Sequence, residues 1–122
     1  MTIMMPPKPG YKRGDVVLVL YPNSDLRTAK TRPALIVQAD DLQTGLPQVI
    51  VAMITGRLFR ANHLSRVMVT VSTPDGQQSG LLTDSVVMTD NLATVAETAI
   101  DRVIGTLPMT DVDNALRHTL KL

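Results

Sequence analysis

The chain contains no cysteine, which excludes disulfide bonds, thiolate zinc sites and catalysis by a thiol. Aromatic residues are nearly as scarce, with two tyrosines, one phenylalanine and no tryptophan. A stacking platform of the kind that single-strand binders use is therefore not expected. No apolar run approaches membrane-spanning length, and the first residues form too short an apolar stretch for a secretory signal. We expect a soluble cytoplasmic protein.

A length of 122 residues predicts one domain, large enough to bury roughly two-thirds of its unfolded surface. Residues 1–10 end in a proline-rich stretch and predict an extended lead-in, which leaves residues 11–122 as the domain. The net charge is only +1, but residues 1–66 carry +5 and residues 67–122 carry −4. This asymmetry favours a polyanion as the ligand of the basic half, although random scatter of few charges could produce the same split.

Short, β-branched apolar runs bounded by turn residues predict buried strands over residues 16–21, 34–39 and 48–55. Residues 66–72 have valine at every second position, which predicts a further strand with one face in the core. The strand pattern continues at residues 81–82 and 85–88, after a predicted turn over residues 74–76.

Residues 97–104 fit either a short helix or a strand. Beyond them, apolar residues recur at helical spacing over residues 112–120, and Thr110 is the expected N-cap of this amphipathic helix. Short strands followed by a single terminal helix predict a mostly-β fold, either a small barrel or a strongly bent sheet.

The most informative local feature is the Arg32-Pro33 step before an apolar run. Proline disfavours the helical region for the residue before it, and a sheet tolerates proline as the first residue of a strand. We therefore predict a polar loop over residues 22–31 and place Arg32 at the rim of the sheet. A guanidinium held there suits a phosphate or a carboxylate, and the alternative is an ordinary surface arginine.

Four sequence blocks occur in a characteristic order and spacing, at residues 13–19, 21–26, 30–37 and 52–55. Together they resemble the MazF/PemK toxins, the endoribonucleases of type II toxin–antitoxin pairs. Residues 84–87 and 104–107 are similar to the longer PemK-type members, so the resemblance covers most of the chain after residue 12. It implies an SH3-like β-barrel with small helices, a homodimer, and an antitoxin protein whose C-terminal tail neutralises the toxin.

The activity implied by the resemblance is cleavage of single-stranded RNA, often messenger RNA, with no metal or other cofactor. Because the 2′-hydroxyl of the RNA attacks the adjacent phosphate, the protein must hold the backbone, stabilise phosphoryl charge and manage two protons. Arg32 matches the catalytic arginine of the family, which implies phosphate clamping and transition-state stabilisation. Thr55 matches the catalytic threonine or serine at the end of the third strand, and its hydroxyl can donate to a phosphoryl oxygen.

Three further cations, Lys30, Arg57 and Arg60, are candidate contacts to backbone phosphates, with a solvated basic rim as the alternative for each. Asp25, in the loop before the arginine, could orient Arg32 or accept a proton. Some relatives have an acid five residues before the arginine, but this chain has Arg27 there, so no general base is identified.

One departure from the family pattern is Gly56, which stands where many relatives have serine after the threonine. It keeps open a non-cleaving barrel that binds nucleic acid or an antitoxin-type peptide, and the sequence also leaves open a gyrase-directed relative. His63 and His118 have no partners at metal-ligand spacing, so no metal site is expected.

Overall fold

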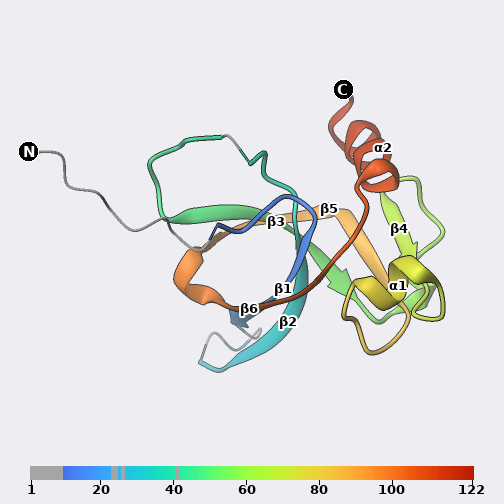
Figure 1. Ribbon diagram of the computed structural model, residues 1–122, viewed down its shortest axis with the longest axis horizontal. Helices are drawn as coiled ribbons and strands as arrows, with labels where there is room; N and C mark the ends of the chain where they lie inside the picture. Colours follow the sequence, from blue (N-terminus) through green and yellow to red (C-terminus); the bar gives the residue numbers. More distant parts are fainter. Residues whose placement is uncertain (1–9, 23–24, 26, 41) are drawn as a thin grey trace, which may run out of the picture.

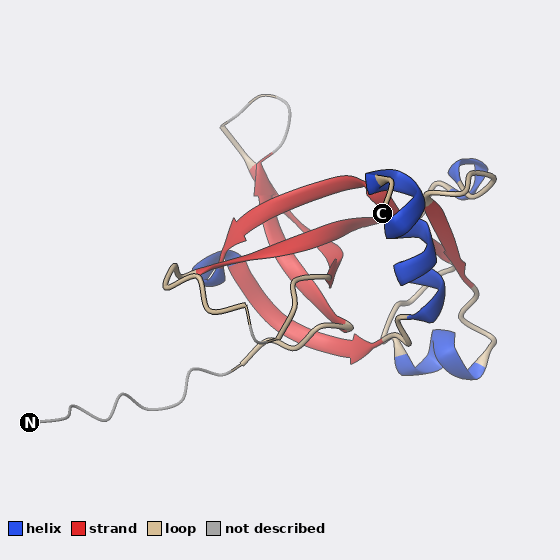
Figure 2. Cartoon of the chain, turned by 90° about the horizontal axis from the view of Figure 1, so that it is seen from above, coloured by secondary structure: helices blue, strands red, loops and turns tan. Residues whose placement is uncertain are grey.

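The computed structural model describes residues 10–22, 25, 27–40 and 42–122. Its six strands form one antiparallel sheet in the order β4-β5-β3-β2-β1-β6, which curves round on itself (Figure 1, Figure 2). The mostly-β prediction with a C-terminal helix is confirmed. The strands are β1 Asp15–Pro22, β2 Ala29–Ile36, β3 Gln48–Thr55, β4 Arg66–Val69, β5 Ser85–Ala96 and β6 Ile100–Thr106. The helices are α1 Pro74–Gln78 and α2 Thr110–Leu120, with 3-10 turns η1 Leu58–Arg60 and η2 Glu97–Ala99.

The central strands are apolar on both faces because each face covers a separate core. Val16, Leu35 and Ala52 point into one core, which Val112 of α2 completes. The intervening residues of the same strands form the second core, together with Ile100 of β6. The buried strands predicted over residues 16–21 and 48–55 are therefore confirmed, and the alternation explains why their sequences show no polar face.

Helix α2 covers the end of the sheet formed by β4 and β5 (Figure 1). The predicted amphipathic face is confirmed, since Val112 and Ala115 are buried. Thr110 is not the N-cap, however. The cap is Met109, which makes no side-chain capping bond, and Thr110 already belongs to the helix.

Two interpretations of the middle of the chain are wrong. Residues 74–76 begin helix α1 instead of forming a simple turn, because the hydroxyl of Thr73 accepts the N–H of Gly76 and Pro74 occupies the first helical turn. Residues 81–82 are not strand, and Leu82 is 95% exposed. The strand at residues 66–72 ends early, at Val69, because the backbone then turns.

The N-terminal predictions fall partly outside the described residues, namely the lead-in over residues 1–9 and positions 23, 24 and 26 of the predicted loop. The ambiguous stretch 97–104 contains both alternatives, as η2 followed by β6. Within the described part of the chain, no helix has the length and apolar character needed to cross a membrane.

Arg32 does not precede the strand, because β2 already begins at Ala29 and pairs with β1 over most of its length. Pairing between β2 and β3 is shorter and covers only Ala34 to Ile36. Just beyond β2, the N–H of Val37 donates to the carbonyl of Ile50. An antiparallel ladder repeats such bonds at every second residue, so residue 33 would direct its N–H at β3. Pro33 has no N–H, and the two strands separate there.

Strand β5 contains a bulge opposite β3. Met53 pairs with Met88 and Ala52 pairs with Leu92, so residues 89–91 have no partner on β3. Thr89 in the bulge is buried, and its hydroxyl donates to the carbonyl of Ser65. Such a bulge re-aims the side chains that follow it, which is a common feature beside functional sites.

Gly80 joins the end of α1 to β6 by a close backbone contact. Its φ is +73°, and a Cβ atom there would lie 2.0 Å from the carbonyl oxygen of Ile104. Gly45 has nearly the same φ, +75°, but no atom would lie within 4 Å of its Cβ. A comparison of substitutions at Gly80 and Gly45 therefore separates the cost of backbone strain from the cost of a steric clash.

We predict that Gly80→Ala lowers the free energy of unfolding by about 3 kcal/mol, because both strain and the clash act there. Gly45→Ala, with strain alone, should cost about 1 kcal/mol. Urea unfolding followed by circular dichroism measures both. Equal losses for the two variants would show that the contact with Ile104 is unimportant.

Candidate functional site

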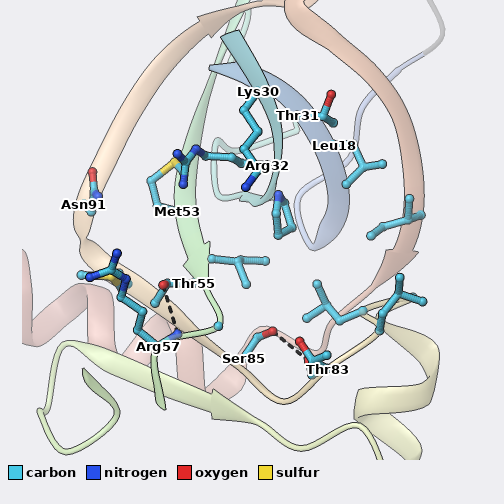
Figure 3. Close-up of a pocket in the computed structure, with 18 of the residues that line it drawn as sticks. Leu18, Lys30, Thr31, Arg32, Met53, Thr55, Arg57, Thr83, Ser85 and Asn91 are labelled. Carbon is cyan, nitrogen blue, oxygen red and sulfur yellow. Dashed lines mark hydrogen bonds between the residues drawn. The ribbon is translucent and has the colours of Figure 1, made fainter. Parts of the chain in front are cut away.

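A cavity of about 650 Å³ opens where β2 and β3 separate (Figure 3). Its walls come from β1, β2, β3, β5 and β6 and from the segment between α1 and β5. The separation at Pro33 therefore determines the position of the cavity. Leu18, Met53 and Ile104 supply apolar wall, and Asn91 reaches the cavity from the β5 bulge.

Among the described residues, five cationic side chains line this cavity, and no acidic or histidine side chain does. The four predicted from the sequence lie together there, and the fifth is on β6: Lys30, Arg32, Arg57, Arg60 and Arg102. In Figure 3, Lys30, Arg32 and Arg57 reach into the same space from β2 and from the end of β3. Within the part of the chain that the structure describes, four of these cations have no ion-pair partner, and Arg102 has only an exposed contact of 4.0 Å with Asp101. This concentration of positive charge makes the cavity a site for an anion with several charges.

Arg32 and Thr55 occupy corresponding positions on the two separated strands. The last paired residues are Ala34 and Met53, so one more two-residue step along this register sets Arg32 opposite Thr55. Both line the cavity, and Arg32 is exposed. Among the described residues, no carboxylate forms an ion pair with the Arg32 guanidinium.

The hydroxyl of Thr55 is oriented by its own loop. Its oxygen accepts the N–H of Arg57 at 3.2 Å, which leaves the hydroxyl proton available to a ligand (Figure 3). The backbone turn that makes this bond also places the Arg57 side chain in the cavity wall. Thr55 is thus set up as a donor in the cation-lined cavity.

Arg60 is held at the cavity rim by two contacts. Its guanidinium carbon lies 5.7 Å from the centre of the Phe59 ring, and its Nη1 lies 3.8 Å from Sδ of Met88. A guanidinium over an aromatic ring keeps its charge and loses part of its freedom. Arg60 is therefore oriented before any ligand binds.

Arg102 was missed by sequence reasoning. It lies on β6, paired with Leu18 of β1, in the stretch where helix and strand were both possible. Only the pairing of β6 with β1, residues distant in sequence, brings it to the cavity. The neutral polar residues Thr83, Ser85 and Asn91 were missed for the same reason.

Asp25 is not part of the cavity lining. Its carboxylate accepts the backbone N–H groups of Arg27 and Thr28 and the Thr28 hydroxyl. These hydrogen bonds hold the pKa of Asp25 below its ordinary value, and the bond from the Arg27 N–H has the largest effect. The carboxylate orders its own loop and does not reach Arg32 through any of these bonds.

The two histidines also lie outside the cavity. Nδ1 of His63 is 2.6 Å from the Ser65 hydroxyl, and the His63 ring meets the His118 ring edge-on at 6.1 Å. Within the described residues, no group of three side chains is arranged to hold a metal ion.

The family model for PemK-like, MazF-like toxins of type II toxin–antitoxin systems matches residues 12–121 of this chain. Among solved structures, the chain is similar to the Mycobacterium tuberculosis toxin MazF-mt6, with 25% identity, a TM-score of 0.66, and coverage of 88% of this chain and 97% of that one. A mycobacterial endoribonuclease in complex with its cognate antitoxin gives 22% identity and a TM-score of 0.68, covering 92% and 96%. A MazE-MazF structure from Deinococcus radiodurans gives 14% identity and a TM-score of 0.69, covering 93% and 98%.

We predict that Asp25 titrates at lower pH in the folded protein than in the urea-unfolded chain, because its hydrogen bonds favour the charged form. The depressed pKa means that its contribution to stability is present above the unfolded pKa and is lost as the pH falls through the folded pKa. Carboxyl carbon NMR titration checks this directly. Thr28→Val should raise the folded pKa, and coincident folded and unfolded titrations would contradict the loop geometry.

Proposed function

This chain belongs to the PemK-like, MazF-like toxins of type II toxin–antitoxin systems, and we propose that it is an endoribonuclease that cuts single-stranded RNA in the cavity between β2 and β3. The observation that carries this proposal is the cation-lined, acid-free cavity with Arg32 and Thr55 on facing strands. An RNA backbone supplies the several negative charges that such a cavity favours.

The proposed reaction uses the RNA itself as nucleophile. The 2′-hydroxyl gives its proton to water as its oxygen bonds to the adjacent phosphorus. The bond from phosphorus to the 5′-oxygen breaks and that oxygen takes a proton from water, leaving a 2′,3′-cyclic phosphate and a 5′-hydroxyl. Arg32 neutralises the charge that grows on the phosphoryl oxygens. The Thr55 hydroxyl donates its free proton in a hydrogen bond to one of these oxygens. Since no carboxylate or imidazole of the described residues lines the cavity, charge stabilisation and positioning are the contributions assigned to this chain.

Lys30, Arg57 and Arg60 are proposed to hold the phosphates on either side of the scissile one, and Arg102 joins them from β6. We also propose that cleavage is sequence-specific and acts on messenger RNA. Asn91, which is neutral and offers both donors and an acceptor, can read the edge of an unpaired base.

A cognate antitoxin is the proposed protein partner, in keeping with the antitoxin complexes of the similar structures. An acidic tail would compete with RNA for the cations of the cavity. A homodimer in the cytoplasm is the proposed working form. Two apolar residues are available for self-association: Leu64, 73% exposed just before edge strand β4, and Met68, 42% exposed within it.

The second candidate, a barrel that binds RNA without cutting it, is favoured only by Gly56. No atom would lie within 4 Å of a Cβ at this position, so the cavity lacks the hydroxyl that a serine would add there. The two candidates agree on the ligand and differ only on strand scission.

We predict that the purified protein cuts a long RNA in the presence of EDTA, and that Arg32→Ala lowers the rate by about 100-fold to 1000-fold because one charge-stabilising group is lost. Arg32→Lys should recover little, since an ammonium lacks the guanidinium fork. Thr55→Val should lower the rate by about 10-fold to 100-fold. Cleavage products are mapped by primer extension.

Arg117→Ala is the matched control, because Arg117 is an exposed arginine on α2 and does not line the cavity. All variants are compared at equal folded fraction by circular dichroism. Intact RNA after long incubation with the wild-type protein would leave only the binding module. Equal cutting by Arg32→Ala would remove the assigned role of this arginine.

We predict a strong salt dependence of RNA binding. If each of the five cations meets one phosphate, the logarithm of the association constant falls with that of salt concentration with a slope of about −3.5. Arg102→Ala should make the slope shallower by about 0.7, whereas Arg117→Ala should leave it unchanged. A slope unaffected by Arg102→Ala would exclude this residue from the RNA path.

A further inference from the structure

The single phenylalanine of the chain is not used in the core. Phe59 lies in turn η1, where no residue is buried, and it is 77% exposed. A large aromatic side chain left in water gains nothing from the hydrophobic effect in the folded chain alone. Its neighbours in sequence are less exposed, since Leu58 is 42% exposed and Arg60 is half-buried.

Phe59 is nevertheless fixed in relation to the cavity. Its ring centre is 5.7 Å from the Arg60 guanidinium carbon, and Arg60 lines the cavity. Arg57, two residues before, lines the cavity as well. The exposed ring therefore contacts one cation of the cavity wall, Arg60, and lies two residues along the chain from a second, Arg57.

We propose that Phe59 is a base-stacking residue, which takes one unpaired nucleobase of an RNA whose phosphates lie on Arg57 and Arg60. This inference rests on the proposed function and adds a specific binding contact outside the cavity. In a single strand each base is attached next to its phosphate, so an exposed ring in contact with a phosphate-binding arginine is within reach of a base. Stacking needs no particular base, because every base has a π-face.

The contact also explains a preference for single strands. Bases in a duplex already stack on one another, whereas an unpaired base can leave its neighbours and lie on an aromatic ring. The flanking positive charges favour an RNA over an apolar peptide as occupant of this ring. The scarcity of aromatic residues excludes a platform of several rings, but one ring suffices for one base.

The test is binding of a fluorescent, single-stranded 2′-O-methyl RNA of mixed sequence, which cannot be cut, measured by anisotropy over a salt series. Phe59→Ala should raise Kd about 10-fold, because one stacked base is lost. The salt slope should not change, because every phosphate contact is kept. Phe59→Tyr should bind as the wild type does, and Phe59→Leu should resemble Phe59→Ala. Double-stranded RNA should show no difference between wild type and Phe59→Ala.

Leu46→Ala is the control, since Leu46 is 55% exposed and does not line the cavity. Unchanged binding by Phe59→Ala, or full binding by Phe59→Leu, would overturn the stacking role. Loss of binding to an acidic peptide but not to RNA would instead make Phe59 a protein-docking residue. A wild-type protein that binds the methylated RNA but cuts no RNA would refute the proposed cleavage alone and leave the stacking result standing.

Discussion

Strand β2 separates from β3 at Pro33, where the ladder would need an N–H that proline lacks. On its other side β2 stays paired with β1 through this residue, so the strand stays in the sheet while one edge is left open. The cavity occupies that open edge. Arg32 and Thr55, which the register would have brought opposite each other, face a space in which a ligand takes the place of the missing pairing.

The remaining walls of the cavity depend on contacts far from it in sequence. The β5 bulge places Asn91 in the cavity wall. A hydrogen bond from the buried hydroxyl of Thr89 to the Ser65 carbonyl holds the bulge in place. The close approach of Gly80 to the Ile104 carbonyl aligns the segment before β5 with β6. These contacts involve backbone and small side chains, so they leave little freedom for the wall to move.

The arginines of this chain divide into two groups. Outside the cavity, Arg13 pairs with Asp113 of α2 and Arg66 pairs with Asp90 of the β5 bulge, whose pKa it holds below the ordinary value. Inside the cavity, no acid of the described residues stands among the lining side chains, and the one ion pair of a lining cation is the exposed 4.0 Å contact of Arg102 with Asp101. Gathering like charges opposes folding, and proteins retain such arrangements where a ligand compensates them.

Local chemistry was sufficient to predict much of this protein. The two-faced apolar runs predicted β1 and β3, the helical spacing predicted α2, and the sequence blocks predicted the family and four of the five cavity cations. Local chemistry failed where an outcome depended on distant partners. Arg32 seemed to precede a strand because nothing near it revealed that β1 would pair with residues 29–31. Arg102 reaches the cavity through the β1–β6 pairing and Asn91 through the β5 bulge, whereas the carboxylate of Asp25 accepts hydrogen bonds from its own loop.

The sequence by itself determined which residues are apolar, which are charged and where an N–H is missing. Only the tertiary structure decided which of them face one cavity, because strand pairing joins residues that are far apart along the chain.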